Sequence, residues 1–229
     1  MKVINIIQAR MGSSRFPGKM MASLHGRPVL DWVLTRCLQA KSIDSTILAT
    51  SDLSIDDPLS AFAKQQDVSV YRGDEQNVLS RYAQIAEMQN ADIVVRVCGD
   101  RPLIDPQLID LAVDFYRQHD EIDLAYNHIS GEGQHWPRGF GVEVLSADNI
   151  ISMGRNVTDC FHCEHVTSHM WANQDKYVIE PVPFDRTDSI DADIKLDLDT
   201  KEDLLRLQSV AMNIDSEMYD VLDRYLNKE

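Results

Sequence analysis

Short apolar runs alternate with segments of helical periodicity along the first half of the chain. Each run is rich in β-branched residues, has the length of a buried strand and ends at small or polar residues. The expected strands cover residues 3–7, 46–50, 68–71 and 93–97. The last of them is apolar apart from Arg96, which is typical of a central parallel strand that is covered on both faces.

The segments between these strands predict helices, because their apolar residues recur at helical spacing. Helices are expected to open near Pro28, to cover residues 58–65, and to follow the capping residues Asn77 and Asp105. Strands joined by helices form βα units. Residues 1–117 therefore predict an α/β fold with a mostly parallel central sheet and helices on both faces.

The second half of the chain is less regular. Strands are expected over 123–127, 142–145, 177–182 and 194–198, and helices over 149–154 and 159–171. A polar, Gly-rich stretch, 130–140, predicts a loop or lid, and Thr200 and Asp203 have the spacing of a capping box that begins a helix. Since no repeat or linker divides the chain, residues 1–229 are expected to form one domain with two halves, 1–120 and 121–229.

The stretch that follows the first strand, Gln8–Lys19, predicts a phosphate cradle. Its cations are Arg10, Arg15 and Lys19, and they surround the small residues Gly12, Ser13 and Ser14. Small residues let backbone amides approach an anion, and the cations add charge-assisted hydrogen bonds. The spacing is neither that of a Walker A loop nor that of a dinucleotide fingerprint. An ordinary loop with solvated charges is the alternative interpretation.

Composition narrows the class of partner. The net charge is −15 over 229 residues, which disfavours a nucleic-acid partner. An acidic protein that binds polyphosphate needs local cations and favours a divalent ion. No apolar stretch reaches about 18 residues, so no membrane span is expected. The N-terminus lacks the pattern of a signal peptide, and four Cys do not form a disulfide framework, so we expect a cytoplasmic protein.

Acidic residues follow two of the expected strands. Asp100 lies after 93–97, and Asp197 and Asp199 alternate at the end of 194–198, so both would project to one face of that strand. Such carboxylates, with phosphate oxygens and water, suit Mg²⁺. The alternatives are a solvated edge for the Asp-x-Asp pair and a capping role for Asp199.

The Gln8–Lys19 stretch resembles the signature of the SpsF-type (spore-coat polysaccharide) cytidylyltransferase family, which is related to the CMP-Kdo and CMP-acylneuraminate synthetases. The resemblance continues through 72–73, 78–82, 95–105, 164–167 and 198–204, and so covers about residues 3 to 210. It implies a Rossmann-like nucleotidyltransferase (GT-A-like) fold and a homodimer. It also implies transfer of CMP from CTP to a sugar, expected to be a sugar acid, in surface or coat polysaccharide biosynthesis.

This resemblance suggests a role for each candidate residue. Residues 1–120 would bind the nucleotide, with Arg10, Arg15 and Lys19 on the β- and γ-phosphates and the Gly12, Ser13 and Ser14 backbone close to them. Asp100 and Asp199 would hold Mg²⁺ with Asp197 nearby, and Arg10, Lys19, Asp100 and Asp199 would be catalytic. The Ala9 backbone and Arg81 are candidates for the cytosine pocket, although Arg81 could equally pair with a helix neighbour.

Residues 121–229 would bind the acceptor and contribute to the metal site. The family commonly reads Pro-Asp-Gly-x-Asp-x-Glu where this chain has Pro137–Glu143, so Arg138 and Gly141 replace two acids. Arg138 is a candidate for binding an acceptor carboxylate or phosphate, or is a surface charge. Glu143 is expected to bind sugar hydroxyls, Trp136 to stack on a sugar ring, and His165 to support the pocket or pack in the core.

Two further interpretations concern other chemistry. Cys160, Cys163, His165 and His169 resemble metal ligands in spacing, but no second Cys pair completes a zinc site, so buried cysteines are expected. The alternatives to a cytidylyltransferase are a metal-dependent glycosyltransferase that uses Asp197 and Asp199, and a non-catalytic nucleotide- or sugar-binding relative.

Overall fold

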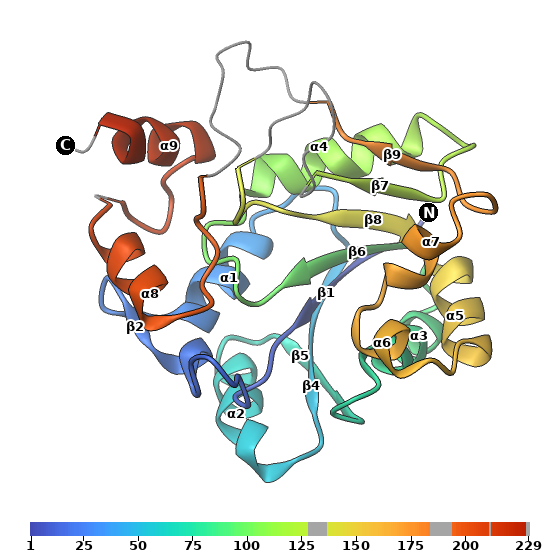
Figure 1. The fold of residues 1–229 in the computed structure, drawn as a ribbon, viewed down its shortest axis with the longest axis horizontal. Helices are drawn as coiled ribbons and strands as arrows, with labels where there is room; N and C mark the ends of the chain where they lie inside the picture. Colours follow the sequence, from blue (N-terminus) through green and yellow to red (C-terminus); the bar gives the residue numbers. More distant parts are fainter. Residues whose placement is uncertain (128–136, 184–193, 211, 228–229) are drawn as a thin grey trace.

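A computed structural model describes residues 1–127, 137–183, 194–210 and 212–227, and within them a seven-stranded sheet forms the centre of the protein (Figure 1). Its strand order is β5 (Ser69–Gly73), β4 (Ser45–Ser51), β1 (Val3–Gln8), β6 (Ile93–Cys98), β8 (Glu143–Ser146), β7 (Leu124–Tyr126) and β9 (Ile179–Pro181). The first four strands are parallel, β8 is antiparallel to both of its neighbours, and β9 is parallel to β7. The predicted mostly parallel sheet is confirmed.

Helices cover both faces of this sheet, as predicted (Figure 1). One hydrophobic cluster holds side chains of α1 (Val29–Cys37), α2 (Asp57–Gln65), α4 (Pro106–Arg117), α8 (Lys201–Gln208) and α9 (Met218–Asn227). The other holds side chains of α3 (Val78–Gln89), α5 (Ala147–Asn156) and α7 (Ser168–Ala172), and α6 (Cys160–Glu164) lies against α3. In β1, Val3 and Ile7 join the first cluster while Ile4 and Ile6 join the second, because side chains of a strand alternate between faces.

The capping residues lie where the sequence predicts. Asn77 accepts a hydrogen bond from the Ser80 amide at 2.9 Å, and Asp105 accepts one from the Gln107 amide at 2.8 Å. Thr200 and Asp203 form the reciprocal bonds of a capping box. These caps need only residues close in sequence, which explains why the helix starts could be predicted.

The helix expected near Pro28 starts at Val29, directly after a small hairpin in which Arg27–Pro28 (β3) pairs with Ser23–Leu24 (β2), so this prediction is confirmed. Two other local predictions are wrong. The helix expected over 159–171 is broken into α6 and α7 at His165–Thr167, where the Thr167 hydroxyl donates to buried Glu143 at 2.9 Å.

The second wrong prediction is the strand expected over 194–198. Among the described residues it forms only an isolated bridge, between Lys195 and Arg138. Its amides bond instead to two irregular segments: that of Leu196 donates to the Arg138 carbonyl and that of Leu198 to the Asp100 carbonyl, each at 2.8 Å. Two three-residue 3₁₀ helices, Lys19–Met21 (η1) and Ser54–Asp56 (η2), follow β1 and β4 along the chain. Within the described residues, no helix is long and apolar enough to cross a membrane.

Candidate functional site

A pocket of about 340 Å³ opens at the carboxyl ends of β1 and β6, where ligands bind in open α/β sheets. It brings together ten of the residues singled out from the sequence: Ala9, Arg10, Ser13, Ser14, Arg15, Lys19, Arg81, Asp100, His165 and Asp199. Gly12, Arg138, Glu143 and Asp197 do not line it. The pocket therefore unites the predicted phosphate loop with the two acidic segments, although they are far apart in the chain.

A buried aspartate holds the loop that follows β1. Asp56, at the end of η2, accepts the Met11 amide at 2.7 Å, and its other oxygen accepts the Ser51 amide at 3.1 Å. The Met11 carbonyl in turn accepts the amides of Ser13 and Gly18 at 2.9 and 3.0 Å. Sequence reasoning missed Asp56, and the available signal was an acidic residue just after the strand that neighbours β1.

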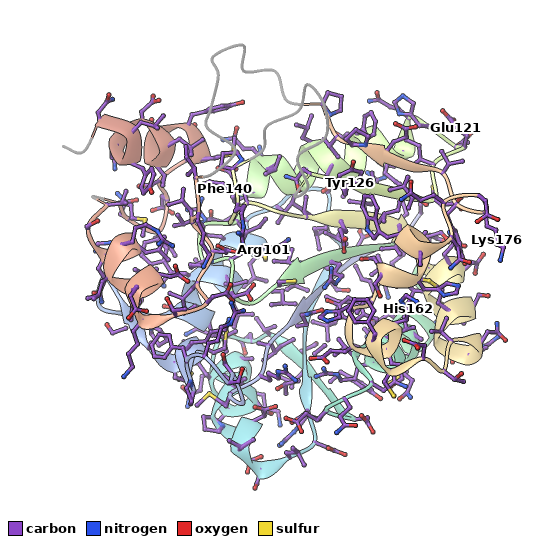
Figure 2. All side chains as sticks on the ribbon, in the orientation of Figure 1. Arg101, Glu121, Tyr126, Phe140, His162 and Lys176 are labelled. Carbon is purple, nitrogen blue, oxygen red and sulfur yellow. The ribbon has the colours of Figure 1, made fainter. Side chains whose placement is uncertain are left out.

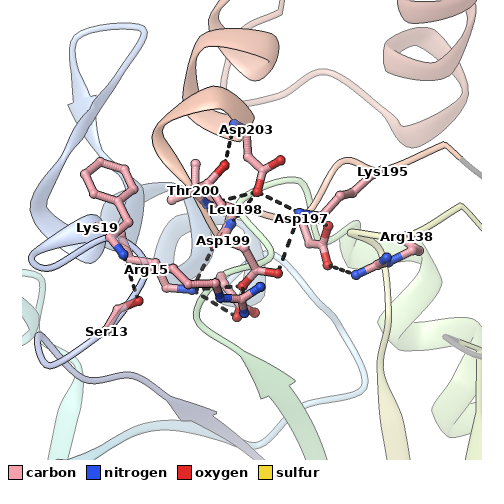
Figure 3. A network of polar contacts seen from close by, with 12 residues as sticks. Ser13, Arg15, Lys19, Arg138, Lys195, Asp197, Leu198, Asp199, Thr200 and Asp203 are labelled. Atoms are coloured by element: carbon pink, nitrogen blue, oxygen red, sulfur yellow. Dashed lines mark hydrogen bonds and ion pairs between the residues drawn. The ribbon is translucent and has the colours of Figure 1, made fainter.

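Lys19 lies between the two predicted metal ligands (Figure 3). Its ammonium is 3.2 Å from Oδ2 of Asp100 and 3.5 Å from Oδ1 of Asp199, and it donates to the Leu198 carbonyl at 2.8 Å. Arg15 reaches the same Oδ1 of Asp199 at 2.9 Å. The side chain of Lys19 is only 11% exposed. The two carboxylates thus converge on one cation, despite the large sequence separation between them.

The donor set fits a magnesium ion that is completed by a ligand. Among the described residues, no group of three or more His, Cys, Asp or Glu side chains could hold a metal by itself. Mg²⁺ in nucleotide enzymes commonly takes one or two carboxylates and fills its octahedron with phosphate oxygens and water. Asp100 and Asp199 supply that number of carboxylates, at the place where Lys19 now supplies the positive charge.

Asp197 takes a different direction from Asp199. Its Oδ2 pairs with Arg138 at 3.0 Å, and it lies outside the pocket lining (Figure 3). The expectation that both carboxylates share one face assumed a regular strand, and the segment is not one. The structure therefore gives no support to Asp197 beside Asp100. Arg138 is 53% exposed and forms this ion pair, so it is more than a solvated charge.

Arg81 is the unusual side chain of the pocket. It is 3% exposed, and its Nε and Nη1 atoms have no hydrogen-bond partner among the described residues. Burial lowers the pKa of its guanidinium below the ordinary value. Because an unpaired buried cation is costly, two free donors in a pocket indicate a place for ligand acceptors. The predicted alternative, a pair with a helix neighbour, is absent in the described residues. The Ala9 amide already donates to the Ala49 carbonyl at 3.2 Å.

Arg96, Gln8 and Cys98 also line the pocket and were not predicted. Arg96 donates to Oε1 of Gln8 at 3.2 Å and pairs closely with Glu143. Burial lowers the pKa of Arg96, but Cys98 and Glu143 raise it more, so the net shift is upward and the guanidinium stays charged. A single Arg within the apolar run of β6 was the signal for this residue.

Glu143 lies behind the pocket instead of in it. It is 1% exposed, one of its oxygens pairs with Arg96 and the other accepts the Thr167 hydroxyl. Direct contact with sugar hydroxyls, as expected from the resemblance, is not supported by this burial. The carboxylate instead holds Arg96 against the pocket.

Arg10 and His165 also line the pocket. Arg10 pairs with Glu164 of α6 at 3.1 Å, and His165 lines the pocket with its ring 4.6 Å from that of Phe161. Gly12 is exposed, and a Cβ at this position would lie 3.4 Å from Oε1 of Glu75, so a carboxylate lies next to the Gly12 backbone. Trp136 lies outside the described residues.

The Cys and His residues of α6 and α7 do not form a metal centre in the described part of the chain. Cys163 is buried, as expected, but Cys160 is exposed. His162, shown in Figure 2, accepts or donates a hydrogen bond with the Ser168 hydroxyl at 2.8 Å and stacks edge-on with His169. Elsewhere, Arg101 donates to the Gly141 carbonyl and joins the segment after β6 to that before β8 (Figure 2).

Known proteins resemble the chain over nearly its whole length. Residues 4–217 match the family described as cytidylyltransferase. The chain is 32% identical over 210 residues to the spore coat polysaccharide biosynthesis protein SpsF of Bacillus subtilis (strain 168), covering 88% of this chain and 82% of that protein. It is 39% identical over 113 residues to the 3-deoxy-manno-octulosonate cytidylyltransferase of Pelobacter propionicus, covering 49% of this chain and 44% of that enzyme.

A solved structure agrees with these matches. The structure of a cytidylyltransferase from Leptospira borgpetersenii serovar Hardjo-bovis aligns with a TM-score of 0.90 at 29% identity, covering 99% of this chain and 94% of that one. The resemblance and the nucleotidyltransferase fold expected from the sequence are confirmed.

Proposed function

Because the chain belongs to the cytidylyltransferase family, we propose that it transfers CMP from CTP to a sugar hydroxyl and releases pyrophosphate. One observation carries the proposal: three cations of the β1 loop face Asp100 and Asp199 in one pocket. A triphosphate needs that positive charge, and the reaction needs carboxylates for a divalent ion close to the bond that breaks. Residues 1–229 would act as one catalytic domain.

The reaction forms one bond to phosphorus and breaks another. The acceptor hydroxyl loses its proton to solvent as its oxygen bonds to the α-phosphorus of CTP. The bond from that phosphorus to the bridging oxygen breaks, and pyrophosphate leaves with the electron pair. Arg10, Arg15 and Lys19 would bind the β- and γ-phosphates and stabilise the charge that develops on them. Asp100 and Asp199 would hold Mg²⁺, which when bound neutralises phosphate charge and lowers the barrier to attack.

Arg81 supports CTP over UTP as the substrate. Its unpartnered N–H groups, on Nε and Nη1, lie on different edges of the guanidinium, so one of them would donate to the base. Cytosine N3 accepts such a hydrogen bond, whereas uracil carries a hydrogen on N3 and would leave the donor unpaired. An unpaired buried donor costs about 1–3 kcal/mol, which is enough for a preference of roughly ten- to a hundredfold.

The acceptor is proposed to be a sugar acid. This rests on the family resemblance and on Arg138, a half-exposed cation that precedes β8 and pairs with Asp197. Planar guanidinium groups bind carboxylates in two-pronged geometry. We also propose a role in surface or coat polysaccharide biosynthesis, as the name of SpsF suggests for that protein.

Two further parts of the proposal concern the cell and the assembly. A cytoplasmic location is supported by the four cysteines, which are all free in the structure. A homodimer rests on the resemblance alone, and sedimentation of the purified protein tests it. A glycosyltransferase would need Asp197 and Asp199 together on a nucleotide-sugar, and the pairing of Asp197 with Arg138 disfavours that alternative.

The decisive experiment measures pyrophosphate release from CTP with Mg²⁺ and a panel of sugar acids. Asp199→Asn serves as the inactive variant, and Asp148→Asn, an exposed acid on α5, as its matched control. We expect acceptor-dependent pyrophosphate with wild type and Asp148→Asn only, and much less with UTP. Tight CTP binding without turnover on any acceptor would support a non-catalytic relative, and consumption of a nucleotide-sugar would support a glycosyltransferase.

A further inference from the structure

A second lysine, outside the pocket, lies among three carboxylates. The ammonium of Lys195 is 2.7 Å from Oδ2 of Asp203, 3.6 Å from Oδ2 of Asp199 and 3.9 Å from Oδ1 of Asp197 (Figure 3). Lys195 does not line the pocket and is 26% exposed. Its charge therefore acts on the three aspartates from outside the pocket, away from the place where a nucleotide would bind.

The two oxygens of Asp199 have different partners. Oδ1 contacts Arg15 and Lys19, both of which line the pocket, whereas Oδ2 faces Lys195. A carboxylate that turned part of the way about its terminal torsion would move both oxygens off these partners, and such torsions are broad. Lys195 opposes that rotation because it attracts Oδ2 from one side while the pocket cations attract Oδ1 from the other.

Asp203 fixes both Lys195 and the backbone that carries Asp199. Its Oδ2 accepts the amides of Asp199 and Thr200, each at 2.9 Å, in addition to Lys195, and its Oδ1 accepts Arg206 at 2.6 Å. Asp203 is 3% exposed. Burial raises the pKa of this carboxyl, but the hydrogen bonds from the four donors lower the pKa by a larger amount. The net pKa therefore lies well below the ordinary value, and the carboxyl stays charged.

We propose that Lys195, anchored by Asp203, is a positioning residue that aims Oδ1 of Asp199 at the divalent ion. This rests on the proposed function, because it assigns Lys195 to the metal site that the function requires. Lys195 touches neither nucleotide nor metal in this arrangement. Its removal would leave three close carboxylates without their shared counter-ion, and their repulsion would shift Asp199.

The test compares Lys195→Met with Lys195→Arg and with Lys201→Met, a matched loss of charge at an exposed position at the start of α8. Binding of Mn²⁺ is measured by electron paramagnetic resonance on protein saturated with the α,β-methylene analogue of CTP, which cannot release pyrophosphate. We expect Lys195→Met to weaken Mn²⁺ binding about tenfold, which corresponds to about 1.4 kcal/mol. Lys195→Arg should restore most of it, and Lys201→Met should resemble wild type.

A second readout separates positioning from loss of structure. Binding of the analogue without metal is expected to change less than about twofold in Lys195→Met, since the phosphate cations remain in place. The proposal is overturned if Lys195→Met binds Mn²⁺ as wild type does. It is also overturned if metal-free binding of the analogue falls to the same extent as Mn²⁺ binding. Because no turnover is needed, failure of the proposed transfer reaction shows separately, as absent pyrophosphate release by a wild type that still binds Mn²⁺.

Discussion

Lys19 and Asp100 form an ion pair of 3.2 Å at the carboxyl ends of β1 and β6, at the centre of the pocket. The same ammonium reaches Asp199, so a lysine occupies the space between the two carboxylates that would hold a divalent ion. A lysine and a divalent cation repel each other strongly at such distances in a partly buried site. If Asp100 and Asp199 hold the metal as proposed, Lys19 would first have to move away from them, toward the phosphates of the nucleotide.

The first prediction follows from this exchange of cations. Lys19→Met is expected to lower kcat/KM by about 10²-fold or more, because phosphate stabilisation is lost. In the protein without nucleotide, the same variant should bind Mn²⁺ more tightly than wild type, because the competing ammonium is gone. Steady-state kinetics and Mn²⁺ titration measure the two effects. Lys64→Met, on the exposed side of α2, is the control, and weaker Mn²⁺ binding by Lys19→Met would contradict the exchange.

The second prediction concerns base selection by Arg81. Arg81→Met is expected to lower kcat/KM for CTP by roughly ten- to a hundredfold and to change that for UTP little, so that the preference between them shrinks. The thermal stability of the nucleotide-free protein should stay equal or rise, because an unpaired buried guanidinium has been removed. A lower melting temperature together with an unchanged ratio of CTP to UTP activity would show that Arg81 is structural.

The third prediction tests the contact that places the acidic segment. Gly139 has φ of +111°, and a Cβ there would lie 2.5 Å from the Leu196 carbonyl carbon. Gly139→Ala should therefore displace residues 196–199, lower activity and destabilise the fold by about 2 kcal/mol or more. Gly26→Ala is the matched control, because Gly26 has φ of +81° but nothing within 4 Å. It should cost only about 1–2 kcal/mol and spare activity. Thermal melts and kinetics of both variants decide the matter.

The fourth prediction is a dependence of stability on pH through Asp203. Its folded pKa lies below the unfolded value of 3.8, so its contribution is complete above that pH and is lost as the pH falls from there toward the folded pKa. Asp203→Asn should thus be less stable than wild type at neutral pH, and the difference should shrink below about pH 4. Urea unfolding across this range measures it. A difference that stays constant with pH would contradict the charged state of Asp203.

The fifth prediction uses the cysteines as probes of the pocket. Burial raises the pKa of the Cys37 thiol to about 12, so iodoacetamide should not modify it in the folded protein. Cys98 lines the pocket and Cys160 is exposed, so both should react. CTP is expected to slow labelling of Cys98 and to leave the rate at Cys160 unchanged, as followed by peptide mass spectrometry. Equal labelling of Cys98 with and without CTP would place the nucleotide elsewhere.

The sequence alone determined the α/β fold class, most element positions and the loop after β1 whose residues line the pocket. The caps at Asn77, Asp105 and Thr200 and the apolar run of β6 depend on residues within a few positions of one another, and local propensity and periodicity report such relationships. The loop cations were recognisable for the same reason, since Arg10, Arg15 and Lys19 lie close together in the chain.

Only the tertiary structure decided which charges meet and in which direction each side chain faces. It paired Lys19 with Asp100 and turned Asp197 toward Arg138. Among the described residues it left Nε and Nη1 of Arg81 without a hydrogen-bond partner, and it broke the helix near Thr167, whose hydroxyl donates to Glu143. These outcomes join residues far apart in sequence, and each depends on burial and on competition among several possible partners. Local patterns carry no information on that competition, because its result is fixed when the sheet brings the strand ends and their loops together.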